Sequence, residues 1–179
     1  MSLFRRRPKL PAALRPALEA EERVLAWAFV GDPGGEQVLV ATNRGLWLPG
    51  GERLGWHEIH KVAWSGRELL VTPAEVAQER DGYAVLIDAP VRGFLLLEPG
   101  ELPDQVRSRV TRSVAYTSHH PLPPHGGVRV VGRRVSGVDG LSWAVRYDAK
   151  TAVDAEPVVE VTDQLVGSAR EATTPAGLK

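Results

Sequence analysis

Short runs of β-branched and aromatic residues, separated by turn-forming residues, fill the segment 24–97 and constrain the fold more than any other feature of the sequence. Clusters of Gly, Pro, Asn and Asp divide the runs at roughly even spacing. Such spacing predicts seven or eight short antiparallel strands, a pattern typical of a β-sandwich or barrel. The runs, with the polar 75–80 as the optional eighth, cover residues 24–30, 37–42, 46–48, 59–64, 68–72, 75–80, 83–87 and 91–97.

Two of the dividing segments predict a particular turn. Asp81-Gly82 is a strong two-residue hairpin signal between the runs on either side of it. In the segment 43–45, Asn43 and Gly45 both tolerate a positive φ. The sequence therefore predicts a three-residue hairpin there, with Gly45 in the left-handed conformation.

Helical periodicity appears only after residue 99. Residues 101–118 carry a valine at every fourth position (106, 110 and 114), which predicts one helix with a narrow apolar face. Residues 128–135 and 141–147 alternate like the strands of a hairpin, joined by a loop at 136–140. Residues 157–172 predict a second amphipathic helix. Its expected apolar face consists of Val158, Val161, Thr162, Leu165, Val166 and Ala169.

These patterns divide the chain into three parts. Residues 1–22 form a basic N-terminal arm, partly helical or disordered. Residues 23–118 hold the strands and the first helix, and residues 119–179 add the hairpin and the second helix. We therefore predict a mainly β protein of the α+β class: an antiparallel sandwich or partly open barrel closed by one helix, with a hairpin–helix extension packed on or beside it.

The most distinctive local motifs lie in the second hairpin and just after it. They are the segment 41–47 (ATNRGLW) and the segment 56–59 (WHEI), which leads into the next strand. With seven strands and a closing helix, residues 23–118 resemble the pleckstrin-homology-like (PH-like) fold, in particular the bacterial PH-like domains of an uncharacterised actinobacterial family. Those domains carry a similar Thr-x-Arg and Trp-x-x-Ile pattern, and Gly55 departs from it. The resemblance implies a fold and brings no activity with it.

Composition excludes several kinds of chemistry. The chain has no cysteine, so it has no disulfide framework, no cysteine-ligated zinc site and no thiolate nucleophile. The sequence also lacks the glycine-rich phosphate motifs and the nucleophile elbow, and its carboxylates are dispersed. We therefore expect no catalytic residues, no cofactor and no enzymatic activity.

Membrane association is not expected from the sequence. No apolar run reaches the roughly 18 residues that a spanning helix needs, and prolines interrupt the basic N-terminus. We expect a cytoplasmic protein without a transmembrane segment. Phosphoinositide head groups are unlikely ligands on electrostatic grounds, because the first hairpin loop (31–36) contains two acids and no base.

Histidines offer two candidate metal motifs, and neither has the usual ligand spacing. His57 and His60 are three residues apart where a strand begins, whereas a zincin helix needs two histidines four apart. The second group lies in a proline-rich segment that we expect to be a loop, with no nearby carboxylate to orient the imidazoles. The residues of this second group, His119, His120 and His125, are therefore weak candidate ligands, and we expect no metal there.

The tryptophans provide the candidate partner surface. Four of the five lie inside apolar runs, where large aromatics usually belong to the core: Trp27, Trp47, Trp64 and Trp143. The fifth, Trp56, lies between Gly55 and His57, and we expect it to be partly exposed. The candidate partner-binding residues are Trp56, His57 and Arg44.

The formal net charge is zero, with 22 basic and 22 acidic residues, but the charges are unevenly distributed. Residues 1–15 carry five bases and no acid, and residues 101–150 carry eight bases and four acids. Arginines from the helix and the hairpin, including Arg107, Arg129 and Arg146, could form one basic face that binds phosphates. The candidate polyanion-binding residues are Arg5, Arg6, Arg7, Arg109, Arg112, Arg133 and Arg134.

Three hypotheses of function follow, of which the most distant is a small-molecule-binding or metal-dependent site near His119, His120 and His125. The first is a non-catalytic cytoplasmic module that binds a protein or peptide partner, through Trp56 or the open edge of a sheet. The alternative is binding of a nucleic-acid backbone through the N-terminal arm and the basic face from Arg107 to Arg146.

Overall fold

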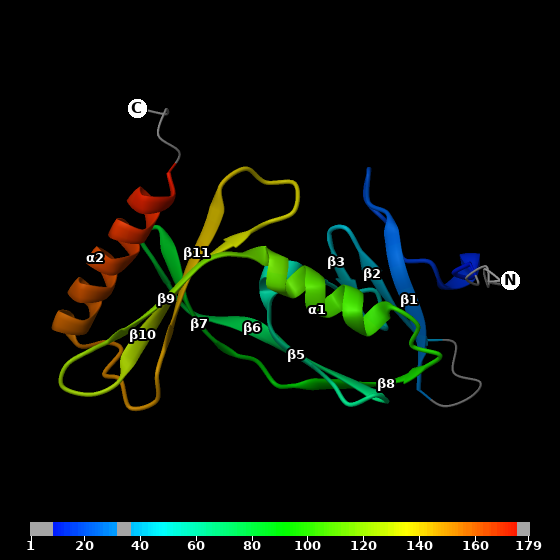
Figure 1. Cartoon of the computed structure of the whole chain (residues 1–179), viewed down its shortest axis with the longest axis horizontal. Coiled ribbons are helices and arrows are strands. Elements are labelled where there is room, and N and C mark those ends of the chain that lie inside the picture. The colour runs from blue at the N-terminus through cyan, green and yellow to red at the C-terminus, as the bar shows by residue number, and fades with distance from the viewer. Residues whose placement is uncertain (1–8, 32–36, 175–179) are drawn as a thin grey trace, which may run out of the picture.

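The computed structural model of the chain describes residues 9–31 and 37–174. These residues form a mainly β protein with two α-helices, which confirms the predicted fold class at that level (Figure 1). The elements in chain order are η1 (Ala12–Leu14), β1 (Val24–Val30), β2 (Gln37–Thr42), β3 (Gly45–Trp47), β4 (Arg53–Gly55), η2 (Trp56–Glu58), β5 (Ile59–Trp64), β6 (Glu68–Arg80), β7 (Tyr83–Asp88), β8 (Arg92–Leu97), α1 (Leu102–Ser113), β9 (Val114–Pro121), β10 (Gly127–Arg134), β11 (Leu141–Tyr147) and α2 (Glu156–Thr173).

The strands join into one long mixed sheet. Its order is β4-β3-β2-β1-β8-β6-β7-β11-β10-β9, and β5 pairs with β6 outside this path. Every pair is antiparallel except β11 with β7, which run parallel. The two ends of the path, β4 and β9, do not pair with each other, so the sheet is not closed into a barrel.

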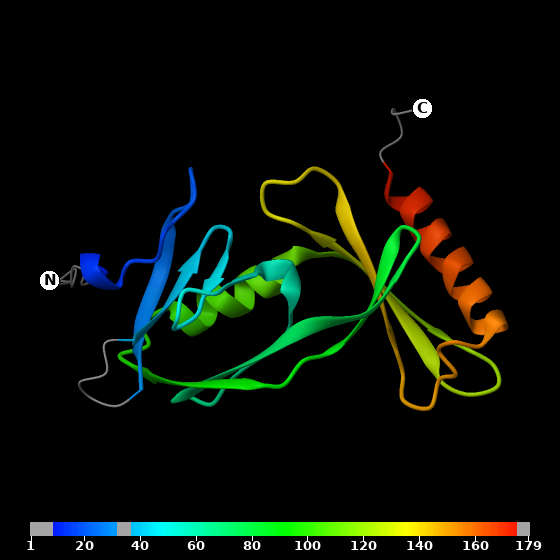
Figure 2. The ribbon, with the colours of Figure 1, turned by 180° about the vertical axis from the view of Figure 1, so that it is seen from behind.

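Strand β6 connects the two halves of the sheet (Figures 1 and 2). Its first part pairs with β5 and β8, and its second part pairs with β7. The partner changes at Pro73, whose missing N–H would interrupt a regular ladder. The two separate runs predicted at 68–72 and 75–80 are therefore one strand of 13 residues. The predicted Asp81-Gly82 turn is confirmed, with Gly82 at a φ of 80° between β6 and β7.

The first hydrophobic core lies between the strands β1–β6 and β8 and the helix α1. Helix α1 crosses the inner side of this curved part of the sheet (Figure 1). It buries one apolar face, and Pro103 occupies its first turn, where the absent N–H is not needed. The largest fully buried side chains of this core are Leu39, Leu46, Ile59, Leu69, Leu102, Val71 and Val106.

The second core lies at the other end of the molecule, where α2 packs on β7, β10 and β11 (Figure 2). The predicted C-terminal helix and the hairpin loop before β11 are confirmed. Val161 was placed on the apolar face of the helix and is instead 37% exposed. Neither described helix is long and apolar enough to cross a membrane. The buried members of this core are Tyr83, Val85, Leu122, Val128, Val130, Val145, Val158, Val166 and Ala169.

The helix predicted over 101–118 is too long. Helix α1 ends at Ser113, and Val114 begins the eight-residue strand β9, which pairs with β10. From Val114 onward the side chains alternate between exposed and partly buried positions, the period of a strand. The four-residue spacing of the valines continued by coincidence past the real end of the helix.

The predicted left-handed conformation of Gly45 is also wrong. Gly45 is the first residue of β3 and does not have a positive φ. Its role is steric, because a Cβ at this position would collide with the carbonyl oxygen of Leu54 on β4. Glycine here allows two backbones to approach closely.

Candidate functional site

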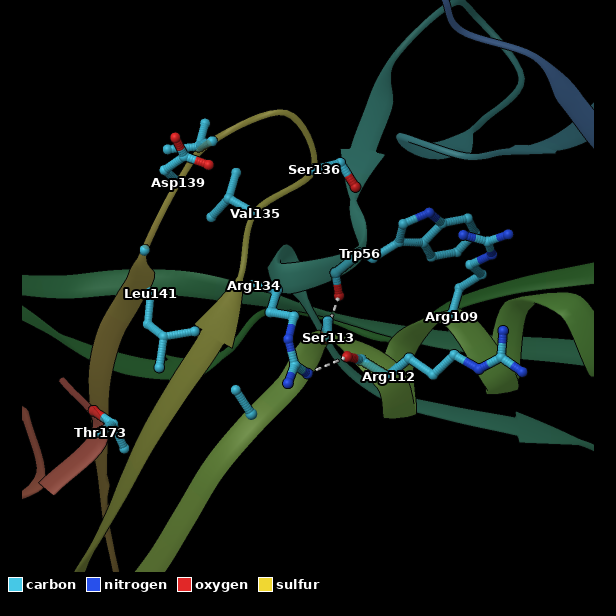
Figure 3. A pocket seen from close by; sticks show the side chains of 13 residues that line it. Trp56, Arg109, Arg112, Ser113, Arg134, Val135, Ser136, Asp139, Leu141 and Thr173 are labelled. Carbon is cyan, nitrogen blue, oxygen red and sulfur yellow. Dashed lines mark hydrogen bonds between the residues drawn. The ribbon is translucent and has the colours of Figure 1, made fainter. Parts of the chain in front are cut away.

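A pocket of about 800 Å³ lies at the point where α1 ends and β9 begins (Figure 3). The loop 135–140, between β10 and β11, forms its opposite side. Ser136 connects that loop to the turn between β2 and β3 by donating a hydrogen bond to the carbonyl of Asn43. We call this cavity the arginine pocket. The residues that define it are Arg109 and Arg112 from α1, Arg134 from β10, and Trp56, Ser136 and Asp139.

The arginine pocket is positively charged. Arg109 and Arg112 are three residues apart and therefore lie on one side of α1. Arg134 is held in place because its Nη1 donates to the carbonyl of Arg112 at 3.0 Å. Within the described residues none of the three forms an ion pair, and Asp139 is the one carboxylate that lines the pocket.

The Nε of Arg109 is the most unusual atom of the pocket. It is buried and has no hydrogen-bond partner among the residues that the structure describes. A buried donor of a charged group is costly when it is left unpaired. Because Arg109, Arg112 and Arg134 have no ion pair within the described residues, the pocket is chemically suited to an anion.

The structure separates the other predicted polyanion-binding arginines from this pocket. Arg133 lies on the opposite face of β10 from Arg134, because neighbouring side chains of a strand alternate. Arg146 forms an ion pair with Asp88 at 2.6 Å. The three arginines at positions 5, 6 and 7 lie outside the described residues.

Arg133 connects the second half of the sheet to the first core. Its Nη1 donates to the carbonyl of Ile59 at 3.0 Å and to the Oγ of Ser113 at 3.0 Å, with a longer bond of 3.4 Å to the carbonyl of Trp56. Burial, with Arg146 nearby, lowers the pKa of Arg133 from its ordinary value. The guanidinium group of Arg133 therefore stabilises the fold through these contacts.

We expect Arg133→Met to lower the free energy of unfolding by about 2 kcal/mol, because it leaves buried acceptors without their donor. Urea denaturation measures the effect. The matched control is Arg129→Met, on the exposed surface of the same strand, which we expect to change stability by less than about 0.5 kcal/mol. Equal losses in the two variants would contradict this role.

Trp56 is not the exposed residue that the sequence suggested. Its residue exposure is only 4%, and its Nε1 donates to the carbonyl of Thr42 at 3.1 Å. It belongs to the first core and reaches the arginine pocket only as part of the wall. The four tryptophans expected in the core are partly buried (Trp27, Trp47, Trp64 and Trp143), and of these Trp64 packs against the first core and Trp143 against the second.

The other two candidates for partner contact also have structural surroundings. Arg44 donates to Glu19 at 2.7 Å and to the carbonyl of Ala20 at 3.0 Å, which fastens the segment before β1. His57 is partly buried in η2, and burial lowers its pKa. The imidazole lies so close to Gly55 that a Cβ there would meet its Cε1 at 2.6 Å.

A buried carboxylate, that of Glu22, contacts Thr42 in the second hairpin and was not revealed by the sequence. The side chain of Glu22 has no exposed surface and accepts hydrogen bonds from Thr42 at 2.6 Å and Trp47 at 2.9 Å. It also accepts from the backbone N–H of Glu19 at 3.0 Å and forms an ion pair with Arg53 at 2.8 Å. We call Glu22 and these partners the Glu22 cluster. It anchors the N-terminal segment to β2, β3 and β4.

The histidine candidates do not form a metal site. His119 and His120 lie on β9, which is a strand and not the predicted loop, so their side chains point to opposite faces. His119 contacts the carboxylate of Asp148 at 2.8 Å, and His120 contacts Ser118 at 2.9 Å. The sequence analysis found no carboxylate near these histidines because Asp148 lies farther along the chain. In residues 9–31 and 37–174, no three His, Asp or Glu side chains gather as metal ligands would.

His60 is nearly buried where the two cores meet. The side chain of His60 is 2% exposed, and its Nδ1 donates to Asp88 at 2.8 Å. Burial lowers the pKa of His60, although the bond to Asp88 opposes the shift. Because Asp88 also pairs with Arg146, the cluster joins β5, β7 and β11, and we interpret it as structural.

Comparisons of the chain with protein-family models, with curated proteins and with solved structures found no match. Function must therefore be argued from the site itself. The arginines of the pocket were among the candidates predicted from the sequence. Ser136 and Asp139 were not, because the sequence indicated only that they belong to a hairpin loop. The five-residue length of that loop was the one available signal that it could reach another part of the molecule.

Proposed function

We propose that this protein is a non-catalytic interaction module, with a PH-like first part, and that its arginine pocket binds an acidic segment of a protein partner. Two features support the PH-like part of the proposal. Seven antiparallel strands follow each other in the order β4-β3-β2-β1-β8-β6-β5, and α1 covers the enclosed side. In this description β7 forms a hairpin with the second part of β6 and continues the sheet toward the second core.

The observation that carries the proposed ligand is the set of unpaired positive groups in the arginine pocket. Three arginines and a single carboxylate line the pocket, and the Nε of Arg109 lacks an acceptor within the described part of the chain. Guanidinium groups bind carboxylates with strong, directed hydrogen bonds. A segment with two or more Asp or Glu residues complements this charge.

An acidic protein segment fits the pocket better than a nucleic acid does. Nucleic-acid binding requires basic groups spaced along an extended surface, so that several phosphates are neutralised. Here Arg133 and Arg146 are occupied by internal contacts, which leaves a local pocket. Trp56 offers too little exposed surface for a base to stack on its ring.

The test compares two labelled probes of equal length, an alternating Glu-Thr peptide and an oligothymidine strand, by fluorescence anisotropy. We expect the peptide to bind and the triple variant Arg109→Gln/Arg112→Gln/Arg134→Gln to weaken that binding by about 2 kcal/mol, roughly thirtyfold in Kd. The matched control is Arg107→Gln, an exposed position on the same helix outside the pocket, which we expect to leave Kd nearly unchanged.

Two outcomes would contradict the proposal. One is tighter binding of oligothymidine than of the peptide, with a steep dependence on salt, which would favour the nucleic-acid alternative. The other is equal loss of peptide binding in the triple variant and in Arg107→Gln, because that would indicate general charge and not the pocket. Circular dichroism of each variant confirms that the fold is intact.

A further inference from the structure

Strand β9 has an open edge. It lies at one end of the sheet and pairs only with β10, so no described strand covers its other side. In an antiparallel ladder alternate residues direct their N–H and C=O groups away from the partner strand. The edge of β9 therefore presents a row of hydrogen-bonding groups that another strand can pair with.

The sequence of β9 lacks the usual protection of such an edge. Its eight residues, VAYTSHHP, include no lysine, arginine or acid, and its one proline is the last residue. Two other strands, β4 and β5, also pair along one side only, and they differ from β9. Strand β4 has only three residues, and β5 carries Lys61 at its exposed side. Natural proteins use short strands and charges of this kind to prevent unwanted pairing, so of these three strands β9 is the best suited to accept a further strand.

The open edge begins at the arginine pocket. Ser113, the last residue of α1, and Ala115, the second residue of β9, both line the pocket. A chain paired along β9 would therefore have one end beside Ser113 and Ala115, in the wall of the pocket that Arg112 and Arg134 also line. The backbone groups and the charged groups lie next to each other on one surface.

We propose that the partner's acidic segment binds in an extended conformation as an added strand on β9, with its acidic side chains in the arginine pocket. This inference rests on the proposed function and adds the mode of binding to it. Backbone hydrogen bonds along β9 would supply affinity for any extended chain, and the arginines would select an acidic one.

A second copy of this protein is a poorer occupant of the edge. In an antiparallel pair of β9 strands, residues of β9 or of the loop after it would approach the pocket of the other copy. The segment 114–127 contains no Asp or Glu, so a second copy would bring no carboxylate to the three arginines there. Charge complementarity therefore favours an acidic partner.

Backbone methylation of the probe tests the mode of binding separately from the pocket. The probe is the labelled Glu-Thr peptide, about eight residues long to match β9. Two further versions carry N-methyl groups on alternate amides, one on the odd and one on the even positions. An added strand uses only one of these two sets, so we expect one version to lose about tenfold or more in affinity and the other to lose little.

Hydrogen exchange supplies a second measurement. We expect the unmethylated peptide to slow amide exchange in residues 114–121, and we expect sedimentation to show one protein molecule in the complex. Equal affinity of all three peptides, with no protection of β9, would overturn strand addition while leaving the arginine pocket as the site. Failure of the unmethylated peptide to bind at all would overturn the proposed function itself. A dimer of the protein that the peptide does not dissociate would also overturn strand addition, because it would assign the edge to a second copy.

Discussion

Trp56→Ala should lower the free energy of unfolding by about 3–5 kcal/mol, the usual range for removing a buried tryptophan. The indole is 4% exposed, packs in the first core, and donates a hydrogen bond to the carbonyl of Thr42. Its removal leaves both a cavity and a buried carbonyl without a donor. A domain of ordinary stability would lose a large share of its stability, so Trp56→Ala cannot serve as a probe of binding.

Urea denaturation followed by circular dichroism measures this effect. The graded control is Trp56→Phe, which keeps an aromatic ring and loses the N–H. We expect it to cost less than Trp56→Ala, about 1–2 kcal/mol. A Trp56→Ala variant within about 1 kcal/mol of the unchanged protein would show that the side chain is not a core residue.

Glu22→Ala should lower the free energy of unfolding by about 3 kcal/mol, because it leaves the other members of a buried charged cluster unpaired. Four donors converge on this one carboxylate: the Thr42 hydroxyl, the Trp47 indole, the Arg53 guanidinium and the backbone N–H of Glu19. The cluster holds the segment before β1 against β2, β3 and β4. Glu22→Gln keeps the shape and should cost less, since the amide oxygen still accepts hydrogen bonds.

The contribution of Glu22 should depend on pH. Burial alone would raise the pKa of its carboxyl, but the hydrogen bonds from Thr42, Glu19 N–H and Trp47, together with the charge of Arg53, hold that pKa below the ordinary value of 4.5. A carboxyl whose pKa is lower in the folded state stabilises the fold fully above its unfolded pKa. That stabilisation is lost as pH falls through the folded value.

Urea midpoints measured from pH 7 down to below 4.5 test this expectation. The difference in stability between the unchanged protein and Glu22→Gln should shrink as the pH falls through the acidic range. Glu79→Gln, on the exposed part of β6, is the control and should differ little from the unchanged protein at any pH. A gap for Glu22→Gln that stays constant with pH would contradict the proposed role of the carboxylate.

Local features of the fold were predictable because neighbouring residues determine them. Asp81-Gly82 forms the expected two-residue turn, and the period of α2 predicted that helix to within one residue at each end. The end of α1 was not predictable in the same way. Val114 continues the helical spacing, but pairing with Arg133 on β10 determines that it belongs to a strand.

Features that depend on contacts between distant parts of the chain could not be predicted from the sequence. The parallel pairing of β11 with β7 joins segments separated by more than fifty residues, and it makes the sheet continue from one core to the other. The burial of Trp56 depends on α1 packing over η2. Its neighbours Gly55 and His57 suggested exposure, and the helix that covers it lies nearly fifty residues away in the chain.

The site was partly predictable for a definite reason. Arg109 and Arg112 are three apart on one helix, so their shared side follows from the sequence. Arg133 and Arg134 are neighbours on a strand, so only one of them could face the same way as the pocket. Which one does so depends on how β10 lies against α1, and the structure assigns Arg134 to the pocket and Arg133 to the first core.

The most direct test of the arginine pocket is a titration with the Glu-Thr peptide followed by NMR of the arginine Nε–H groups. The account predicts that the Nε–H signals of Arg109, Arg112 and Arg134 shift together and give the Kd measured by anisotropy. Binding of the peptide with these three signals unmoved, or with Arg107 shifting as much as they do, would contradict the account.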